Sequence, residues 1–279
     1  MNSKIVFKQL LGGVAHKLLK QPDAPVVVLN YHSVGGGSRK SACKIEFEEH
    51  LDAVVNKWQL SVIDWQNKNK HYASKSAPSV LFSFDDGYED NYHIVAPILE
   101  KYGVKGLFFL TSGYLDGDFD ITQGVSAYEG LKPMTWGNAH DMQMRGHTMA
   151  LHGHTHKSFS RLSQSEAREE FTMSSAAFVN SLGASSNSFA YPFGQRHHQR
   201  KDLNRIIEGL GVQYIFTTEN KRMDAALLHT EDKGVVIIPR IRIDPGDSVI
   251  VLKQKIFGLW DYIAYVQLIK SKIPSLLRG

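Results

Sequence analysis

Strand-like and helix-like segments alternate along almost the whole chain, and this alternation limits the fold more than any other feature. Continuous apolar runs typical of buried parallel strands occur at Val26–Tyr31, Ser79–Phe84 and Lys105–Thr111. Segments with helical periodicity lie between them, at Phe47–Trp58 and from about Asp90 to Tyr102. Strands that alternate with helices predict a parallel sheet.

The alternation continues nearly to the end of the chain. Further helices are expected at Met134–Arg145, Ser163–Leu182 and Lys201–Leu210. Further strands are expected at His147–Leu151, Ser188–Tyr191, Tyr214–Thr217, Val235–Ile238 and Ile241–Ile243, the last two flanking Pro239 and Arg240. So many units in one chain of 279 residues favour closure of the sheet into an α/β barrel.

Composition excludes several classes of protein. The 32 Lys and Arg residues against 28 Asp and Glu leave a net charge of +4, too small to indicate a nucleic-acid-binding protein. A hydrophobic fraction of 42% is sufficient for a packed core. The single cysteine, Cys43, excludes an internal disulfide and a multi-cysteine zinc finger.

Both ends of the chain are amphipathic. Residues 1–23 are expected to form an amphipathic helix, because their apolar residues recur at spacings of three and four and lysines interrupt them. Lysines likewise break the apolar tail in residues 246–279, which is expected to be a helical extension. We therefore expect no signal peptide, no transmembrane helix and a cytoplasmic protein, with peripheral membrane contact as the alternative.

Two adjacent carboxylates, Asp85 and Asp86, follow the expected strand Ser79–Phe84 and precede Gly87. Successive strand residues point in opposite directions, so the two carboxylates should have different environments. The end of a strand is also the rim at which α/β barrels carry their chemistry. An ordinary turn is the alternative interpretation, because Asp-Gly is common in loops.

Five of the 13 histidines lie between His140 and His156. His152 and His156, four residues apart after a strand, are spaced to face one ion, whereas His154 is expected to point away. With Asp86 they would form a site of two histidines and one aspartate with an open position, as in catalytic zinc centres. Asp85 would then be free to act on water, and a solvated histidine-rich loop is the alternative.

A third segment, Phe189–Gly194, ends in a sequence typical of a tight turn. Pro192 and Gly194 bracket Phe193, and the backbone N–H groups of such a turn can project into a pocket at the rim. Tyr191, Pro192 and Phe193 are therefore candidates for contact with a molecule bound at the rim. An ordinary loop is the alternative.

Taken together, these segments resemble a known family. Ser83–Gly87, Gly146–His156 and Phe189–Gly194 are similar, in order and approximate spacing, to the three main motifs of the polysaccharide deacetylases of carbohydrate esterase family 4, the NodB-homology domain. The resemblance covers residues 24–245 and implies a distorted (β/α)7-type barrel as the catalytic domain. It also implies a metal-dependent sugar N-deacetylase, with zinc as the expected ion and cobalt or nickel as alternatives.

The segment Val28–Val34 resembles the one that precedes the Asp-Asp motif in the permuted branch containing poly-N-acetylglucosamine deacetylases. That resemblance implies that His32 is the general acid; without it, His32 would be interpreted as a hydrogen-bonded histidine at a strand end. His229 is a weaker alternative for the acid. His197 and His198 are expected to be solvated loop residues.

The chain departs from the family pattern at two positions. Gly153 replaces a serine or threonine, and Ala190 replaces an arginine that orients the catalytic aspartate in many members. Arg240 is the candidate replacement for that arginine, with a surface ion pair as the alternative.

The reaction implied by the resemblance is hydrolysis of an acetamide. Asp85 would take a proton from water, the Phe193 N–H would help to hold the oxyanion, and His32 would protonate the departing amine. The expected partner is an N-acetylated sugar or glycan precursor, lipid-linked or nucleotide-linked for a cytoplasmic enzyme. A deformylase or non-sugar amidase on the same metal site, and a carbohydrate-binding relative without turnover, are the alternatives.

Overall fold

The computed structural model describes residues 22–67, 77–123, 126–229, 234–264 and 266. Nine strands form one sheet, and seven of them are parallel and close into a barrel. The barrel strands are β1 (Pro25–Tyr31), β3 (Ser79–Phe84), β4 (Leu107–Leu110), β5 (Thr148–Leu151), β6 (Ser188–Ala190), β7 (Tyr214–Thr217) and β9 (Val236–Arg242). The barrel closes because β1, which pairs with β9, also pairs with β3. The short β2 (Ser61–Val62) and β8 (Met223–Asp224) lie outside it. The expected (β/α)7-type barrel is confirmed.

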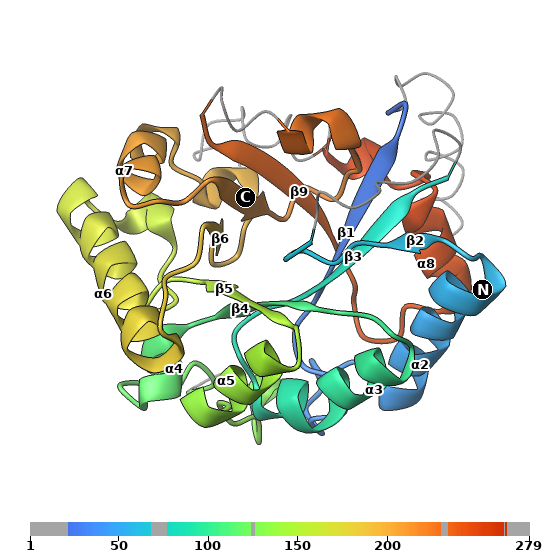
Figure 1. The fold of residues 1–279 in the computed structure, drawn as a ribbon, viewed down its shortest axis with the longest axis horizontal. Helices are drawn as coiled ribbons and strands as arrows, with labels where there is room; N and C mark the ends of the chain where they lie inside the picture. The colour runs from blue at the N-terminus through green and yellow to red at the C-terminus, as the bar shows by residue number, and fades with distance from the viewer. Residues whose placement is uncertain (1–21, 68–76, 124–125, 230–233, 265, 267–279) are drawn as a thin grey trace.

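Helices surround the strands (Figure 1) and cover the outer face of the barrel, whereas apolar side chains fill its interior. The helices are α2 (Lys44–Asp52), α3 (Ala96–Lys101), α4 (Ser112–Asp116), α5 (Trp136–Met144), α6 (Gln164–Leu182), α7 (Asn204–Gly209) and α8 (Val249–Ile256). Helix α6 begins after the Ser163 cap, whose hydroxyl accepts a hydrogen bond from the Glu166 N–H, and ends at Gly183 with φ 82°.

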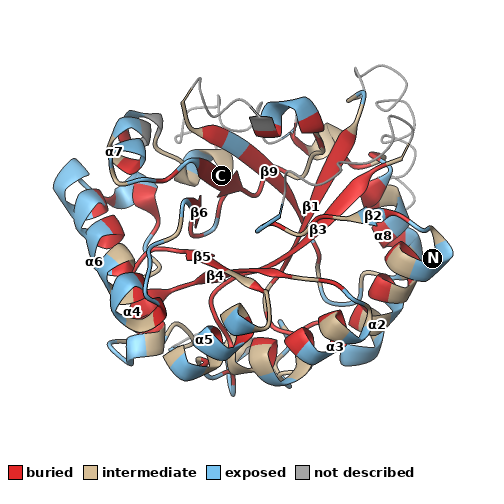
Figure 2. Ribbon diagram, viewed as in Figure 1, coloured by how far each residue is buried: buried red, intermediate tan, exposed pale blue. Residues whose placement is uncertain are grey.

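Alternating strand residues divide the core into two apolar clusters. In β1, Val27, Leu29 and Tyr31 belong to the cluster beneath the helices, whereas Val26 and Val28 belong to the cluster inside the barrel. Figure 2 shows the strands as almost continuously buried and the helices as buried along one side only. The same alternation turns Asn30, the next residue after Leu29, toward the barrel interior at the carboxyl end of β1, where its amide donates to Asp85.

Three segments differ from the expectation or fall outside the described chain. The two strands expected around Pro239 and Arg240 are a single strand, β9. Proline has no backbone N–H to donate. Pro239 is aligned with Thr217, the last residue of β7, so the missing donor lies where the pairing of β7 with β9 ends. The helix expected over residues 1–23 lies outside the described residues except for positions 22 and 23, and only α8 and the turns after it represent the expected C-terminal extension.

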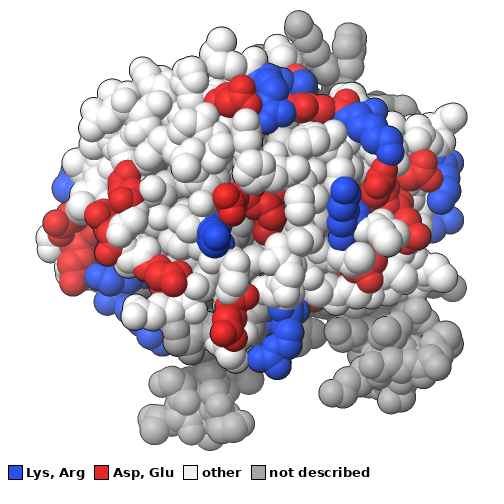
Figure 3. All heavy atoms as spheres, turned by 90° about the horizontal axis from the view of Figure 1, so that it is seen from below, with Lys and Arg blue, Asp and Glu red and all other residues white. Residues whose placement is uncertain are grey.

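Surface charge agrees with the small net charge. On the face seen in Figure 3, acidic and basic side chains are interspersed and form no continuous stripe of one sign. A search of the described residues finds no helix whose length and apolarity would allow it to cross a membrane.

Phe47 of α2 provides a test of the packing between helix and barrel. Its ring is fully buried and lies edge-on to Tyr31 and Phe84, with centroid distances of 5.3 and 5.7 Å. We expect Phe47→Ala to lower the free energy of unfolding by about 3–5 kcal/mol, because it leaves a cavity between α2 and the barrel. Urea denaturation measures this change. Ile45→Ala, on the same helix but 68% exposed, is the control and should change it by less than about 0.5 kcal/mol; equal effects would contradict the packing described.

Candidate metal centre and active-site cavity

A cavity of about 490 Å³ lies at the carboxyl ends of the barrel strands. Its walls include residues that follow β1, β3, β5, β6, β7 and β9. Four of the residues that line it, none of them glycine, adopt positive φ: Asp86 (76°), His156 (54°), Phe193 (65°) and Asn220 (50°). Only one other such residue, Gln59, occurs in the described chain. Left-handed backbone is uncommon for residues other than glycine, and its concentration around one cavity is typical of a functional site.

The backbone at Asp86 explains how two consecutive carboxylates reach the same cavity. In a regular strand they would point to opposite faces. The left-handed conformation of Asp86 turns the chain immediately after Asp85, so both side chains line the cavity while remaining buried. Gly87 continues the turn with φ 86°, and a Cβ there would lie 2.9 Å from a Leu115 methyl group.

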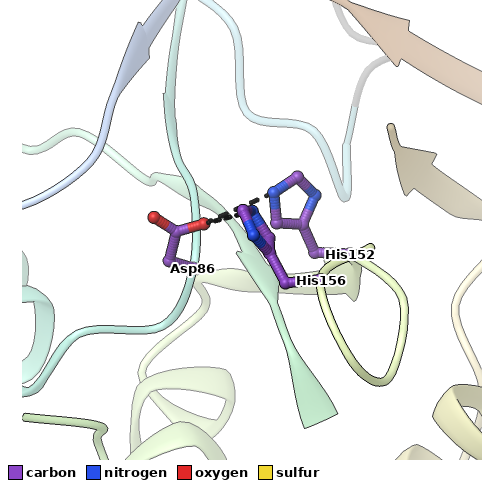
Figure 4. A group of neighbouring side chains, drawn as sticks. All are labelled: Asp86, His152 and His156. Carbon is purple, nitrogen blue, oxygen red and sulfur yellow. Dashed lines mark ion pairs between the residues drawn. The ribbon is translucent and has the colours of Figure 1, made fainter. Parts of the chain in front are cut away.

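Two histidines face Asp86 from the loop after β5 (Figure 4). Nε2 of His152 lies 3.5 Å and Nε2 of His156 lies 3.2 Å from the same carboxylate oxygen, Oδ1 of Asp86. The loop is held from α6 by the buried Glu170, whose carboxylate accepts hydrogen bonds from the His154 and Thr155 N–H groups. The three proposed ligands are therefore brought together.

The donor atoms fit a divalent cation. Nδ1 of His152 lies 2.9 Å from the Ala190 carbonyl oxygen and donates to it, so in the neutral ring Nε2 carries a lone pair and faces a carboxylate oxygen. Oδ1 of Asp86 is buried and accepts no hydrogen bond from a described residue. Two imidazole nitrogens and one carboxylate oxygen that converge in this way form the ligand set of a zinc-type site.

Asp85 has entirely different partners. Its carboxylate is paired at both oxygens with the Arg240 guanidinium, at 2.5 and 2.9 Å, and accepts a further hydrogen bond from the Asn30 amide at 2.9 Å. Arg240 is fully buried and lies over the Phe109 ring, so the alternative of a surface ion pair does not apply. Burial alone would raise the pKa of Asp85, but the Arg240 charge and hydrogen bonds outweigh it and hold that pKa below its usual value.

His32 lies in the same cavity, directly after β1. Its backbone carbonyl accepts a hydrogen bond from the Asn91 side chain at 2.9 Å, which fixes the strand end. Burial lowers the pKa of its imidazole, and the nearby Asp86 and Asp85 carboxylates oppose that shift only in part. The structure thus places His32, Asp85 and Asp86 around a common space.

Of the three residues expected at the site from the segment after β6, only one lines the cavity. Phe193 lines the cavity, with its ring 5.0 Å from the His156 ring. Tyr191 points the other way, because its ring packs among buried aromatic rings and its hydroxyl donates to the Arg200 carbonyl. Tyr191 and Pro192 are not among the residues that line this cavity, so of the three expected residues only Phe193 is brought to it.

Several residues of the cavity wall were not predicted from the sequence to lie at the site. His198, expected to be a solvated loop residue, lines the cavity, and burial together with the charge of His197 lowers its pKa to about 4. Trp260 and Ile263 form another part of the wall. They lie more than 100 residues from the histidine motif, and nothing in the local sequence indicates that the tail folds over the barrel rim. The His229 side chain lies outside the described part of the structure.

Comparison with known proteins agrees with this geometry. Residues 72–215 match the family described as polysaccharide deacetylase. The chain is 28% identical over 232 residues to YxkH of Bacillus subtilis strain 168, which is named as a polysaccharide deacetylase, and the match covers 81% of this chain and 74% of that protein. It is 26% identical over 167 residues to the poly-beta-1,6-N-acetyl-D-glucosamine N-deacetylase of Staphylococcus aureus strain N315, covering 59% of this chain but only 54% of that protein.

Solved structures share the fold. The Streptococcus pyogenes deacetylase PplD, in complex with acetate, superposes with a TM-score of 0.66 at 20% identity and covers 85% of this chain and 99% of its own. IcaB from Ammonifex degensii superposes with a TM-score of 0.61 at 19% identity and covers 88% and 97%. At these identities, the likeness establishes the barrel and not the chemistry.

Removal of one imidazole tests the metal centre. We expect His152→Ala to weaken Zn²⁺ binding at this centre by more than about 10²-fold, because even the loss of an outer-shell partner costs roughly 10–100-fold. Asp85→Asn should bind Zn²⁺ nearly as well as the unmodified protein. Calorimetric titration of metal-free protein measures both, with the exposed His140→Ala as control. Unchanged binding in His152→Ala would contradict the assignment.

Proposed function

This chain is a member of the polysaccharide deacetylase family, and from that premise we propose that it hydrolyses the N-acetyl group of an N-acetylated sugar residue. Asp86, His152 and His156 would hold a divalent cation, with zinc as the first candidate and cobalt or nickel as alternatives. The observation that carries the proposal is the division between two neighbouring carboxylates: Asp86 faces the imidazoles and Asp85 faces Arg240.

This arrangement suits hydrolysis of an amide. A divalent cation in this centre would polarise the acetamide carbonyl and increase the acidity of a water molecule. Asp85 stays ionised because Arg240 is paired with both of its oxygens, so it can accept a proton from the attacking water. The water oxygen bonds to the acetyl carbon, and acetate is one product.

The remaining steps use residues from two other strand ends. When the carbon–nitrogen bond breaks, the sugar nitrogen takes a proton from His32 and leaves as an amine. The Phe193 backbone N–H would help to stabilise the negative charge that develops on the carbonyl oxygen. Residues that follow β1, β3, β5 and β6 thus contribute to one reaction.

We propose a glycan as the substrate. The cavity wall carries two aromatic side chains with accessible surface, Phe193, which is 55% exposed, and the half-buried Tyr128, and such rings suit the apolar faces of sugar rings. A short oligomer of β-1,6-linked N-acetylglucosamine is the first compound to test, because a relative with 26% identity is named for that polymer. Lipid-linked and nucleotide-linked N-acetylated sugars extend the panel.

Acetate release tests the reaction. With the zinc-loaded protein and the oligomer, we expect Asp85→Asn to reduce the rate by about 10²–10⁴-fold, the usual contribution of a positioned general base. The charge-matched control is Asp141→Asn, a surface carboxylate paired with Arg145, which should retain full activity. Release of formate from an N-formyl substrate with no acetate release would identify a deformylase instead. Sugar binding without turnover in the unmodified, metal-loaded protein would contradict an enzymatic role.

Arg240 supplies a separate test, because its role is to position Asp85. Arg240→Lys keeps the charge but loses the fork that pairs with both carboxylate oxygens. We expect kcat to fall by about 10²-fold while KM and Zn²⁺ binding change little, because a small displacement of a catalytic group has this cost. Steady-state kinetics and metal titration together make the measurement. A fall in Zn²⁺ affinity with kcat unchanged would place Arg240 in metal binding.

A further inference from the structure

His154 lies between the two proposed ligand histidines, yet it has no part in the proposed reaction. Its side chain is 93% buried and turns away from Asp86 toward α4. Nδ1 lies 2.9 Å from the Ser112 hydroxyl oxygen, and Nε2 lies 3.3 Å from a carboxylate oxygen of Asp118. The loop of residues 152–156 therefore presents imidazoles to two separate places.

The second place contains two carboxylates. Asp116 is the last residue of α4, and Asp118 follows it after Gly117, which has φ 81°. The Trp136 indole N–H donates to Oδ1 of Asp116 at 2.7 Å and fixes that carboxylate. One ligand atom each from Asp116, Asp118 and His154 lies within 4.8 Å of the other two.

The charges of this group are not balanced by nearby cations. In the part of the chain that the structure describes, neither Asp116 nor Asp118 forms an ion pair with a lysine or arginine. The only basic group found against them there is the His154 imidazole.

The position of the buried His154 depends on a close approach between the 152–156 loop and α4. The Gly113 N–H donates to the His154 carbonyl at 3.0 Å. A Cβ at Gly113 would lie 2.7 Å from that carbonyl oxygen and 3.2 Å from Nε2 of His154. Glycine at this position therefore allows the imidazole to lie against α4 with Nε2 directed at the two carboxylates.

We propose that Asp116, Asp118 and His154 form a second divalent-cation site, distinct from the centre at Asp86. One imidazole nitrogen and two carboxylate oxygens suit Zn²⁺ or Mn²⁺, and the exposed carboxylates leave the remaining positions to water. The ion would tie the 152–156 loop to α4, as Glu170 ties it to α6. Its role is structural: it would hold the loop that carries two ligands of the first centre.

Zinc binding in a protein without the first centre tests this site alone. In the double variant His152→Ala/His156→Ala, the metal-free protein should still bind one equivalent of Zn²⁺ and show a raised melting temperature when Zn²⁺ is added. Adding Asp118→Asn should abolish both effects. Asp116→Asn, which keeps an oxygen to accept from Trp136, should weaken binding by at least tenfold.

Asp120→Asn is the matched control. It removes one negative charge from the same loop, but the Asp120 carboxylate accepts hydrogen bonds from Thr122 and does not belong to the group of Asp116, Asp118 and His154. The control should leave one equivalent of Zn²⁺ bound.

Circular dichroism identifies any variant that fails to fold. No Zn²⁺ bound by the double variant, or one equivalent still bound after Asp118→Asn, would overturn the site. Equal losses from Asp120→Asn and Asp118→Asn would show general charge attraction and would also overturn it. These outcomes do not depend on turnover, so they separate this site from the proposed function.

Discussion

Two adjacent carboxylates buried in one cavity are the constraint on which the rest of the structure depends. Burying an ionised carboxylate without a partner costs several kcal/mol, and two neighbours would repel each other as well. The chain resolves the conflict by giving each a different partner, an arginine for Asp85 and two imidazoles for Asp86. That division depends on the closed barrel, because the partners come from β9 and from the loop after β5, two strands that are not neighbours in the sheet but whose carboxyl ends face one cavity.

The same requirement accounts for the local backbone. Positive φ at Asp86, His156 and Phe193 is uncommon for residues other than glycine, yet all three residues line the cavity. Buried supports oppose the strain: Glu170 holds the histidine loop and Asn91 holds the end of β1. The unfavourable backbone at the rim lowers the stability of the fold, and the aromatic packing below it, as of Phe47 against Tyr31 and Phe84, raises it.

Most of the barrel could be predicted from the sequence, because each strand is a short apolar run and the helices between them have clear periodicity; β3 agrees with its expected bounds residue for residue. The exception was β9, where Pro239 suggested a break that strand pairing with β1 and β7 overrides. At the site, the four-residue spacing of His152 and His156 and the position of Asp86 after an expected strand indicated a ligand set, and the resemblance to the family motifs supported that choice over an ordinary turn and a solvated loop. The roles of Trp260 and His198 could not be predicted, because they depend on how the tail and one loop fold across the rim.

We expect Asp86, and not Asp85, to bind the cation. Diffraction from crystals loaded with Zn²⁺, recorded at the zinc absorption edge, tests it most directly. We expect an anomalous peak about 2.0–2.2 Å from one oxygen of Asp86 and from Nε2 of both His152 and His156, with Asp85 still paired to Arg240. A peak that bridges Asp85 and Asp86, or Zn²⁺ bound with either histidine turned away, would contradict it.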